Sequence, residues 1–280
     1  METWKRTVYI SLVCVFCTAF GVSQLAPILP LYFHDLGVQT PEAMSLWSGL
    51  ATGATYIIVC LAAPFWGRVA DKKGRKITLI RSSFGMALCN VLIAFQTTPE
   101  GVVLIRLIQG LVSGFYSASI TLIASESPIE RTGWALGLLA SANLAGSLIG
   151  PLLGGYIADT VGIRNDFIIV GTLMGLAGVL ATIFIHENYV PQPNPEKLSI
   201  RKLKEQIPEF NSIVALCVAS FIYAICIMSL QPVISVYIKG IVPSDTENLA
   251  FIAGAVFSAM GIAQLMSSSP LGKLVDKIGP

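Results

Sequence analysis

Residues 67–76 read GRVADKKGRK, and they lie between two long segments that contain no Asp, Glu, Lys or Arg, 43–67 and 82–99. An α-helix rises 1.5 Å per residue, so about 20 apolar residues cross the hydrocarbon core of a bilayer, which is roughly 30 Å thick. Both segments reach this length once short flanks are added. The stretch therefore predicts two membrane-spanning helices joined by a short basic loop.

The whole chain continues this alternation of apolar segments and charged loops. Of its 280 residues 54% are hydrophobic and 12% are charged, whereas roughly 25% are charged in an ordinary soluble domain. These proportions exclude a soluble enzyme, a disordered protein and a secreted disulfide scaffold. Lipid offers no partner for an unpaired backbone N–H, so the spans are expected to be helices. We predict an all-α transmembrane fold with eight spans, over the uncharged segments 7–33, 43–67, 82–99, 107–125, 132–158, 167–185, 210–238 and 248–272.

Basic residues are distributed unequally between the two sides of these spans. Fifteen of the 18 Lys and Arg precede the first span or follow an even-numbered one, while Arg164 and Lys239 lie on the other side and Arg106 lies within a span. Because cytoplasmic loops are enriched in Lys and Arg, the pattern predicts a multi-pass protein of the cell (inner) membrane with a cytoplasmic N-terminus. The first segment is longer than the apolar part of a signal peptide, so it is expected to remain as a span rather than be cleaved.

The two ends of the chain resemble each other at a spacing of 205 residues. Two sets of four residues at the same topological point then coincide: Gly67, Asp71, Lys72 and Gly74 match Gly272, Asp276, Lys277 and Gly279. Such duplication is typical of transporters, although chance similarity between apolar segments is the alternative. We expect a six-helix bundle over 1–186, a cytoplasmic linker over 187–211, and the first two helices of a second bundle over 212–280. The chain would then be an incomplete or truncated form of a twelve-helix protein, with eight helices present.

Three motifs resemble those of the major facilitator superfamily. The loop with Gly67, Asp71, Gly74 and Arg75 resembles motif A, and Gly272, Asp276 and Gly279 form its second copy. There Gly67 would allow close helix approach, Gly74 a turn, and Asp71 a helix cap or a contact with an Arg. The spacing alone is weak, because Gly155, Asp159 and Gly162 repeat it on the outer side.

The fourth and fifth spans carry the other two motifs. Arg106, Gln109 and Gly110 are similar to motif B, and with Ser113, Gly114, Ser117 and Thr121 they recur at helical spacing as one small and polar face. The fifth span resembles motif C, the antiporter signature, which comprises Gly146, Gly150, Pro151, Gly154 and Gly155. Its glycines predict a seam for close helix contact, and Pro151 a bend. A generic packing seam is the alternative.

The resemblance implies how such a protein would use protons. In the family the motif B arginine is associated with proton coupling, so this role falls to Arg106, unless the side chain reaches the membrane surface instead. No carboxylate lies in the middle of a span, and Glu126 and Asp35 are the remaining candidates near the span ends. The energy source would be the proton gradient, with no cofactor and no metal.

Five amide and aromatic side chains within the spans are candidates for a substrate pocket, although simple packing is the alternative for each: Gln24, Tyr116, Asn143, Tyr223 and Gln231. The resemblance, which is to the bacterial drug:proton antiporters, implies proton-coupled efflux of amphipathic small molecules by alternating access. The alternatives are an exporter of a natural product such as a siderophore, a nutrient importer, or a membrane enzyme or receptor. We expect a monomer in the lipid bilayer that binds small molecules and protons, binds no nucleic acid and is not an enzyme.

Overall fold

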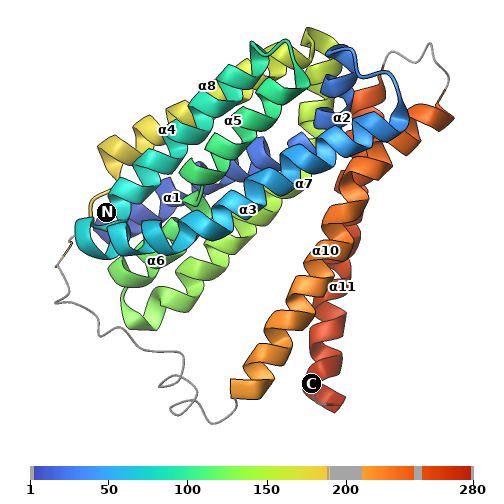
Figure 1. The fold of residues 1–280 in the computed structure, drawn as a ribbon. Coiled ribbons are helices and arrows are strands. Elements are labelled where there is room, and N and C mark those ends of the chain that lie inside the picture. The colour runs from blue at the N-terminus through green and yellow to red at the C-terminus, as the bar shows by residue number, and fades with distance from the viewer. Residues whose placement is uncertain (1–2, 188, 190–209, 243–247, 279–280) are drawn as a thin grey trace.

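The computed structural model describes residues 3–187, 189, 210–242 and 248–278, and for residues 211, 231, 264–265 and 267–278 it describes the backbone only. The described residues form helices and no strands. The helices, labelled in Figure 1, are α1 (Thr3–Ser23), α2 (Leu25–Asp35), α3 (Pro41–Lys73), α4 (Arg75–Ala94), α5 (Pro99–Val112), α6 (Phe115–Glu126), α7 (Ile129–Val161), α8 (Ile163–Phe184), α10 (Phe210–Ile241) and α11 (Leu249–Ile278).

Seven helical segments in the described part of the chain are long and apolar enough to cross a membrane, and they coincide with the first seven predicted spans. The predicted all-helical membrane fold is thereby confirmed. The eighth predicted span coincides with helix α11, of which only Leu249–Ala263 enters this assessment. Two predicted spans are not continuous helices. The first is interrupted at Gln24 between α1 and α2, and the fourth is interrupted between α5 and α6.

Helix boundaries follow local sequence signals. Helices α3 and α5 each begin with a Thr-Pro pair, in which the threonine side chain accepts a hydrogen bond from the backbone N–H three residues later and the proline occupies the first helical position. The two 33-residue helices α3 and α7 each end at a glycine with a φ of +91°, Gly74 and Gly162. Only glycine adopts this conformation at low cost, so both helices stop there and the next helix begins at once.

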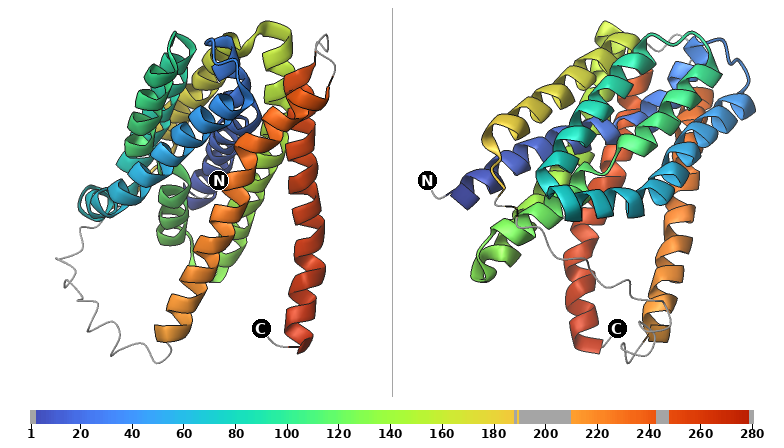
Figure 2. Two further views of the ribbon diagram at one scale, coloured as in Figure 1. Left: turned by 45° about the vertical axis from the view of Figure 1, so that its right-hand side comes forward. Right: turned by 60° about the vertical axis from the view of Figure 1, so that its left-hand side comes forward.

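Helices α1 to α8 form one bundle (Figure 1), in which α1 packs against α7 and α8, α4 packs against α8, and α3 packs against α5. We call the end of this bundle that carries Lys73 and Glu126 the basic end, and the end that carries Asp35 and Val161 the far end. Helices α10 and α11 contact α2, α3 and α7, and they diverge from the bundle toward Phe210 and Ile278 (Figure 2). The two groups of helices therefore meet at the far end and separate toward the basic end.

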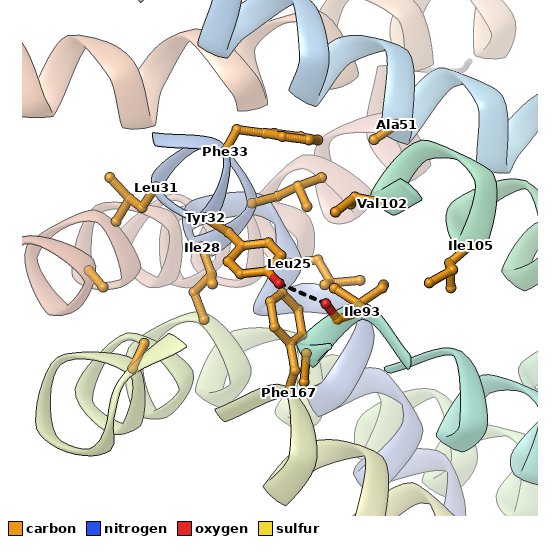
Figure 3. Close-up of a cluster of buried hydrophobic side chains, with 14 of the residues drawn as sticks. Leu25, Ile28, Leu31, Tyr32, Phe33, Ala51, Ile93, Val102, Ile105 and Phe167 are labelled. Carbon is orange, nitrogen blue, oxygen red and sulfur yellow. Dashed lines mark hydrogen bonds between the residues drawn. The ribbon is translucent and has the colours of Figure 1, made fainter. Parts of the chain in front are cut away.

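A cluster of buried side chains fixes helix α2 at the far end (Figure 3). The Tyr32 hydroxyl donates a hydrogen bond to the backbone carbonyl oxygen of Ile93 at 2.7 Å, and its ring packs edge-on against Phe167 with the centroids 5.2 Å apart. Leu25, Ile28 and Phe33 of the same short helix are also buried in this cluster. The contacts tie α2 to α4 and α8 beyond the interruption at Gln24.

Glycines of helix α7 lie directly against helix α1. A Cβ atom on Gly146 would lie 2.6 Å from the backbone oxygen of Phe16, and a Cβ atom on Gly150 would lie 2.6 Å from the backbone oxygen of Phe20. Without a hydrophobic driving force between helices in lipid, such close packing supplies much of the attraction between them. The structure therefore places the motif C glycines at a helix–helix seam. Helix α7 continues through Pro151 without interruption.

This packing predicts opposite effects for the same substitution at two positions of α7. Gly146→Ala should destabilise the protein by about 1–3 kcal/mol, because the added methyl group meets rigid backbone. Gly137→Ala should be neutral or stabilise by up to about 1 kcal/mol, since a Cβ atom there has nothing within 4 Å and alanine favours a helix. Thermal unfolding of the purified protein in detergent measures both. Equal stability of the two variants would contradict the seam.

Candidate functional site

The fourth predicted span is interrupted at Ser113 and Gly114, just after the motif B residues. Helix α5 ends at Val112, and helix α6 starts at Phe115 after Gly114, whose φ is +115°. The prediction of one continuous polar face from Arg106 to Thr121 is therefore wrong. Glycine permits this backbone turn, but unwinding leaves carbonyl oxygens without helical partners, which is costly inside a membrane protein.

Two side chains from neighbouring helices satisfy these carbonyls. Arg81 of α4 donates from Nη1 to the Leu111 oxygen at 3.2 Å and from Nη2 to the Ser113 oxygen at 3.0 Å. Trp66 of α3 donates from Nε1 to the same Leu111 oxygen at 2.7 Å, and the Arg81 guanidinium lies 3.5 Å from the centroid of its ring. A cation over an indole face is itself attractive. Arg81 and Trp66 thus hold the interruption together, and neither was among the predicted site residues.

A cavity of about 350 Å³ lies beside this interruption, between α3, α4, α5 and α6 toward the basic end. It brings motif A and motif B together, because Gly67, Asp71 and Arg75 of the first motif and Gly110 of the second line it. Ser117 and Thr121 line its α6 side. The polar residues beyond the interruption thus face this cavity instead of continuing the Arg106 face.

Motif A is held by the segment that follows helix α8. The Glu187 carboxylate accepts hydrogen bonds from the backbone N–H groups of Arg75 at 2.7 Å and Lys76 at 2.8 Å, so it caps the start of α4. The Tyr189 hydroxyl donates to the backbone oxygen of Asp71. A carboxylate at a helix N-terminus is favourable, because it satisfies free N–H groups and opposes the helix dipole.

Two expectations for this loop are wrong within the described residues. The Asp71 carboxylate forms no hydrogen bond or ion pair with any residue that the structure describes, and Glu187 provides the cap instead. A Cβ atom on Gly67 would have nothing within 4 Å, so this glycine does not mark a close helix contact. The expected turn at Gly74 is present, with a φ of +91°. In the second copy Gly272 and Asp276 belong to α11, but their side chains and all of Gly279 lie outside the described residues.

Arg106 lies in the interior, with 6% of its surface exposed. Its Nη1 donates to Gln109 Oε1 at 2.6 Å, while its Nε has no partner and no carboxylate pairs with the guanidinium among the described residues. The Thr55 hydroxyl donates to the Arg106 backbone oxygen at 3.0 Å, and Gly110 lies against the backbone of Thr55. The motif B residues therefore join α5 closely to α3 and leave a buried cation without a counter-ion in the part of the chain that the structure describes.

The other two candidates for proton coupling lie far from each other along the bundle. Asp35 is at the far end, 57% exposed, with Oδ1 3.9 Å from His34 Nδ1. Glu126 is the last residue of α6 at the basic end and is half-buried. The structure does not gather Arg106, Glu126 and Asp35 into one site.

The five candidates for substrate binding are also dispersed. Gln24 is buried between α1 and α2, Tyr116 packs against a buried cluster around α1 and α6, and Asn143 is half-buried on α7. Tyr223 is 59% exposed on α10, and the Gln231 side chain lies outside the described residues. Of the four whose side chains the structure describes, none lines the cavity beside the interruption or the cavity at the far end. In the described part of the chain all six cysteines are free, and no group of three metal-ligating side chains occurs.

Asp159 connects the two groups of helices at the far end. Its Oδ1 accepts from the Ala250 N–H at 3.1 Å and its Oδ2 accepts from the Phe251 N–H at 2.7 Å, so a side chain of α7 caps helix α11. A cavity of about 250 Å³ lies beside this cap, lined by Asp35 and Lys239 among others. From the sequence, Asp159 was noted only within the string formed by Gly155, Asp159 and Gly162. Its position directly after the motif C glycines was the feature that could have indicated a role.

Below this cap helices α7 and α11 pack backbone to backbone. A Cβ atom on Gly155 would lie 2.7 Å from the Ala250 carbonyl carbon, and a Cβ atom on Gly254 would lie 2.7 Å from the carbonyl carbon of Pro151. The Ser258 hydroxyl donates to the Leu148 oxygen at 2.6 Å. Helix α7 thus presents one glycine row to α1 and a second small-residue surface to α11.

The cap predicts a specific change when Asp159 is replaced. Asp159→Ala removes both acceptors, which should destabilise the contact between α7 and α11 by about 1 kcal/mol. The equilibrium between the state with this contact closed and the state with it open should then shift toward the open state by roughly fivefold. Spin labels at Thr160 and Asn248, with the exposed cysteines replaced, should report longer distances for this variant. Asp159→Asn keeps one good acceptor and should change the distances less. Unchanged distances in Asp159→Ala would contradict the role of the cap.

Comparisons with known proteins agree with this architecture. The sequence model of the Major Facilitator Superfamily matches residues 11–280. The multidrug resistance protein MdtG of Proteus mirabilis (strain HI4320) is 37% identical over 279 residues, which cover 100% of this chain and 69% of that protein. MdtG of Dickeya zeae (strain Ech586) is 38% identical over 277 residues, which cover 99% of this chain and 68% of that protein. The chain thus spans about two thirds of the length of these relatives.

Two solved structures share the fold at low sequence identity. The human organic anion transporter MFSD10 matches with a TM-score of 0.65 and 16% identity, over 93% of this chain and 72% of that one. A D-xylose–proton symporter matches with a TM-score of 0.64 and 16% identity, over 99% of this chain and 69% of that one. Together with the family match and the relatives above 30% identity, these findings identify the chain as a member of the Major Facilitator Superfamily, as its motifs predict.

Proposed function

We propose that this protein is a proton-coupled exporter of amphipathic small molecules that works by alternating access. The observation that carries the proposal is the asymmetric contact between the two groups of helices. The backbone contact at Gly155 and Gly254 and the Asp159 cap join α7 to α11 at the far end, whereas α10 and α11 diverge from the bundle toward the basic end (Figure 2). One end is closed while the other is open, as a carrier that exposes its site alternately requires.

The distribution of basic residues supports an orientation for this arrangement. Fifteen of the 18 Lys and Arg belong to one side of the predicted spans, and this side includes the loop at Gly74. The positive-inside rule then assigns the basic end and the N-terminus to the cytoplasm. In this orientation the structure corresponds to a carrier that is open to the cytoplasm and ready to receive a substrate for export.

Energy coupling to protons is supported by the buried arginine and by a missing nucleotide motif. The sequence has no Walker A string of the GxxxxGK[ST] type, so nothing in these 280 residues favours ATP as the energy source. A guanidinium buried without a carboxylate, as at Arg106, favours an incoming anion or a carboxylate that loses its proton, and it opposes a second cation. The proton gradient is therefore the proposed energy source, and the protein needs no cofactor.

The substrate class is supported by the relatives, which are named for multidrug resistance. The motif C glycines of α7 add to this, because the string resembles the antiporter signature. We propose that the protein acts as a monomer in the lipid bilayer of the cell membrane. A natural-product exporter and a nutrient importer use the same fold, and the transport assay below separates them by direction and by cargo.

Dye efflux tests the proposal directly. The protein is expressed in bacterial cells that lack their own drug exporters. These cells should extrude an amphipathic fluorescent dye, and a protonophore should stop the extrusion. Arg106→Ala and Asp71→Asn should each reduce the rate by roughly tenfold or more, which corresponds to a loss of about 1.4 kcal/mol. Membrane insertion should stay normal in both.

Arg164→Gln is the matched control, because this arginine is exposed at the far end and, among the described residues, hydrogen-bonds the Gln96 backbone oxygen alone. It should extrude dye at the normal rate. Extrusion that persists after the protonophore, or dye uptake in place of extrusion, would refute the proposed function.

A further inference from the structure

Asp166 and Gln24 form a fully buried polar pair at the far end of the bundle. Both side chains have 0% of their surface exposed, and Gln24 Nε2 donates to Asp166 Oδ2 at 3.0 Å. Asp166 lies in the first turn of α8, and Gln24 occupies the interruption between α1 and α2. Gln24 was predicted from the sequence only as a pocket residue, and Asp166 directly precedes the uncharged segment 167–185 and was not among the predicted site residues.

The pair has one hydrogen-bond donor too few for its acceptors. Asp166 Oδ1 and Gln24 Oε1 are both buried, and neither has a hydrogen-bond partner among the described residues. An ionised carboxylate only accepts hydrogen bonds, and an amide oxygen only accepts them, so these two atoms cannot satisfy each other as they stand. A buried acceptor without a donor is costly. One proton added to the carboxyl group supplies the missing donor.

We propose that Asp166 and Gln24 form a proton-binding site, which deepens the proposed function and rests on it for the role of the proton. The proton binds Asp166 Oδ1, and the new O–H group donates to Gln24 Oε1 while Gln24 Nε2 continues to donate to Oδ2. A ring of two hydrogen bonds closes, no bond between heavy atoms changes, and release returns one proton to water.

The surroundings favour the neutral form of the acid. No positively charged group is hydrogen-bonded or ion-paired to Asp166 in the described part of the chain. The start of α8 favours an anion, but this effect is small compared with the cost of burying a carboxylate that has no counter-charge. Charged or ionisable side chains at this end of the bundle include Arg164 of α8 and Tyr32 of α2, and the cavity that contains Ile163 of α8 is also lined by His34, Asp35, Asp159 and Lys239. Of these, Arg164 instead bonds the backbone oxygen of Gln96, and Tyr32 bonds that of Ile93.

Helix α7 covers the site. The side chain of Gln24 lies directly against Gly154 of α7, where any added Cβ atom would overlap its amide. Movement of α7 away from α1 therefore uncovers Gln24 and, behind it, Asp166. The proton would enter from the far end while α7 is displaced from Gln24, and it would be enclosed when α7 packs against Gln24 again.

Infrared difference spectroscopy during a pH titration tests the site, because a protonated carboxyl group has a C=O band that an ionised one lacks. The purified full chain in lipid should show such a band on acidification, and labelling aspartate with ¹³C at its carboxyl carbon should shift it. Asp166→Asn should abolish the band while keeping the fold, since asparagine can form the same two hydrogen bonds with Gln24. Gln24→Leu should keep the band at a higher frequency, because the C=O group loses its N–H donor.

Glu100→Gln is the matched control, because Glu100 is an exposed acid in the first turn of α5 at the same end. It should leave the band unchanged. A band that survives Asp166→Asn, that does not respond to aspartate labelling, or that keeps its frequency in Gln24→Leu would overturn the inference. The spectrum reports proton binding whether or not the protein exports a dye. A failure of efflux would therefore contradict the proposed function alone, and a missing band would contradict this site alone.

Discussion

Close backbone contact along helix α7 is the constraint on which the rest of the structure depends. In lipid the hydrophobic effect does not drive helices together, so van der Waals contact at small residues must supply the attraction. Helix α7 makes such contact on two sides, with α1 through Gly146 and Gly150 and with α11 through Gly155 and Gly254. Helix α7 therefore contacts both the first bundle and the α10–α11 pair, so a movement of α7 relative to α11 also changes its contact with α1.

Buried polar side chains lie where the helices are interrupted. Every unpaired backbone group within the membrane needs a partner. At Gly114 the partners are Arg81 and Trp66, which also border the cavity that contains motif A. At Gln24 the interruption places an amide beside a buried carboxylate. Both interruptions lie against α3 or α7, the two longest helices, so these helices position the polar groups at the interruptions.

The sequence was sufficient for the architecture because membrane spans depend on local composition. Uncharged segments of about 20 residues identified seven spans, and the motif A, B and C strings identified the family. Contacts between distant segments were not predictable in the same way. Glu187 caps α4 from 112 residues away, and Asp159 caps α11 from 91 residues away. Nothing local to either acid indicates its partner, because the partner is a free N–H group brought close only by the fold.

The features of the structure that the sequence did not predict have a common physical origin. Helical periodicity was extended through Gly114, although a glycine with a positive φ ends the helix there. Asp166 directly precedes the uncharged segment 167–185 and was not predicted as a site residue, although the structure buries it completely. Distance along the chain from a span end does not measure burial where neighbouring helices, such as α1 and α2, cover that end.

The central claim is that the contact between α7 and α11 at the far end must open and close during transport. The ring centroids of Tyr156 and Phe251 lie 6.4 Å apart across this contact, so cysteines at both positions can be cross-linked. With the exposed cysteines replaced, the cross-linked protein should lose dye efflux, and reduction should restore it. Full efflux by the cross-linked protein would contradict the account.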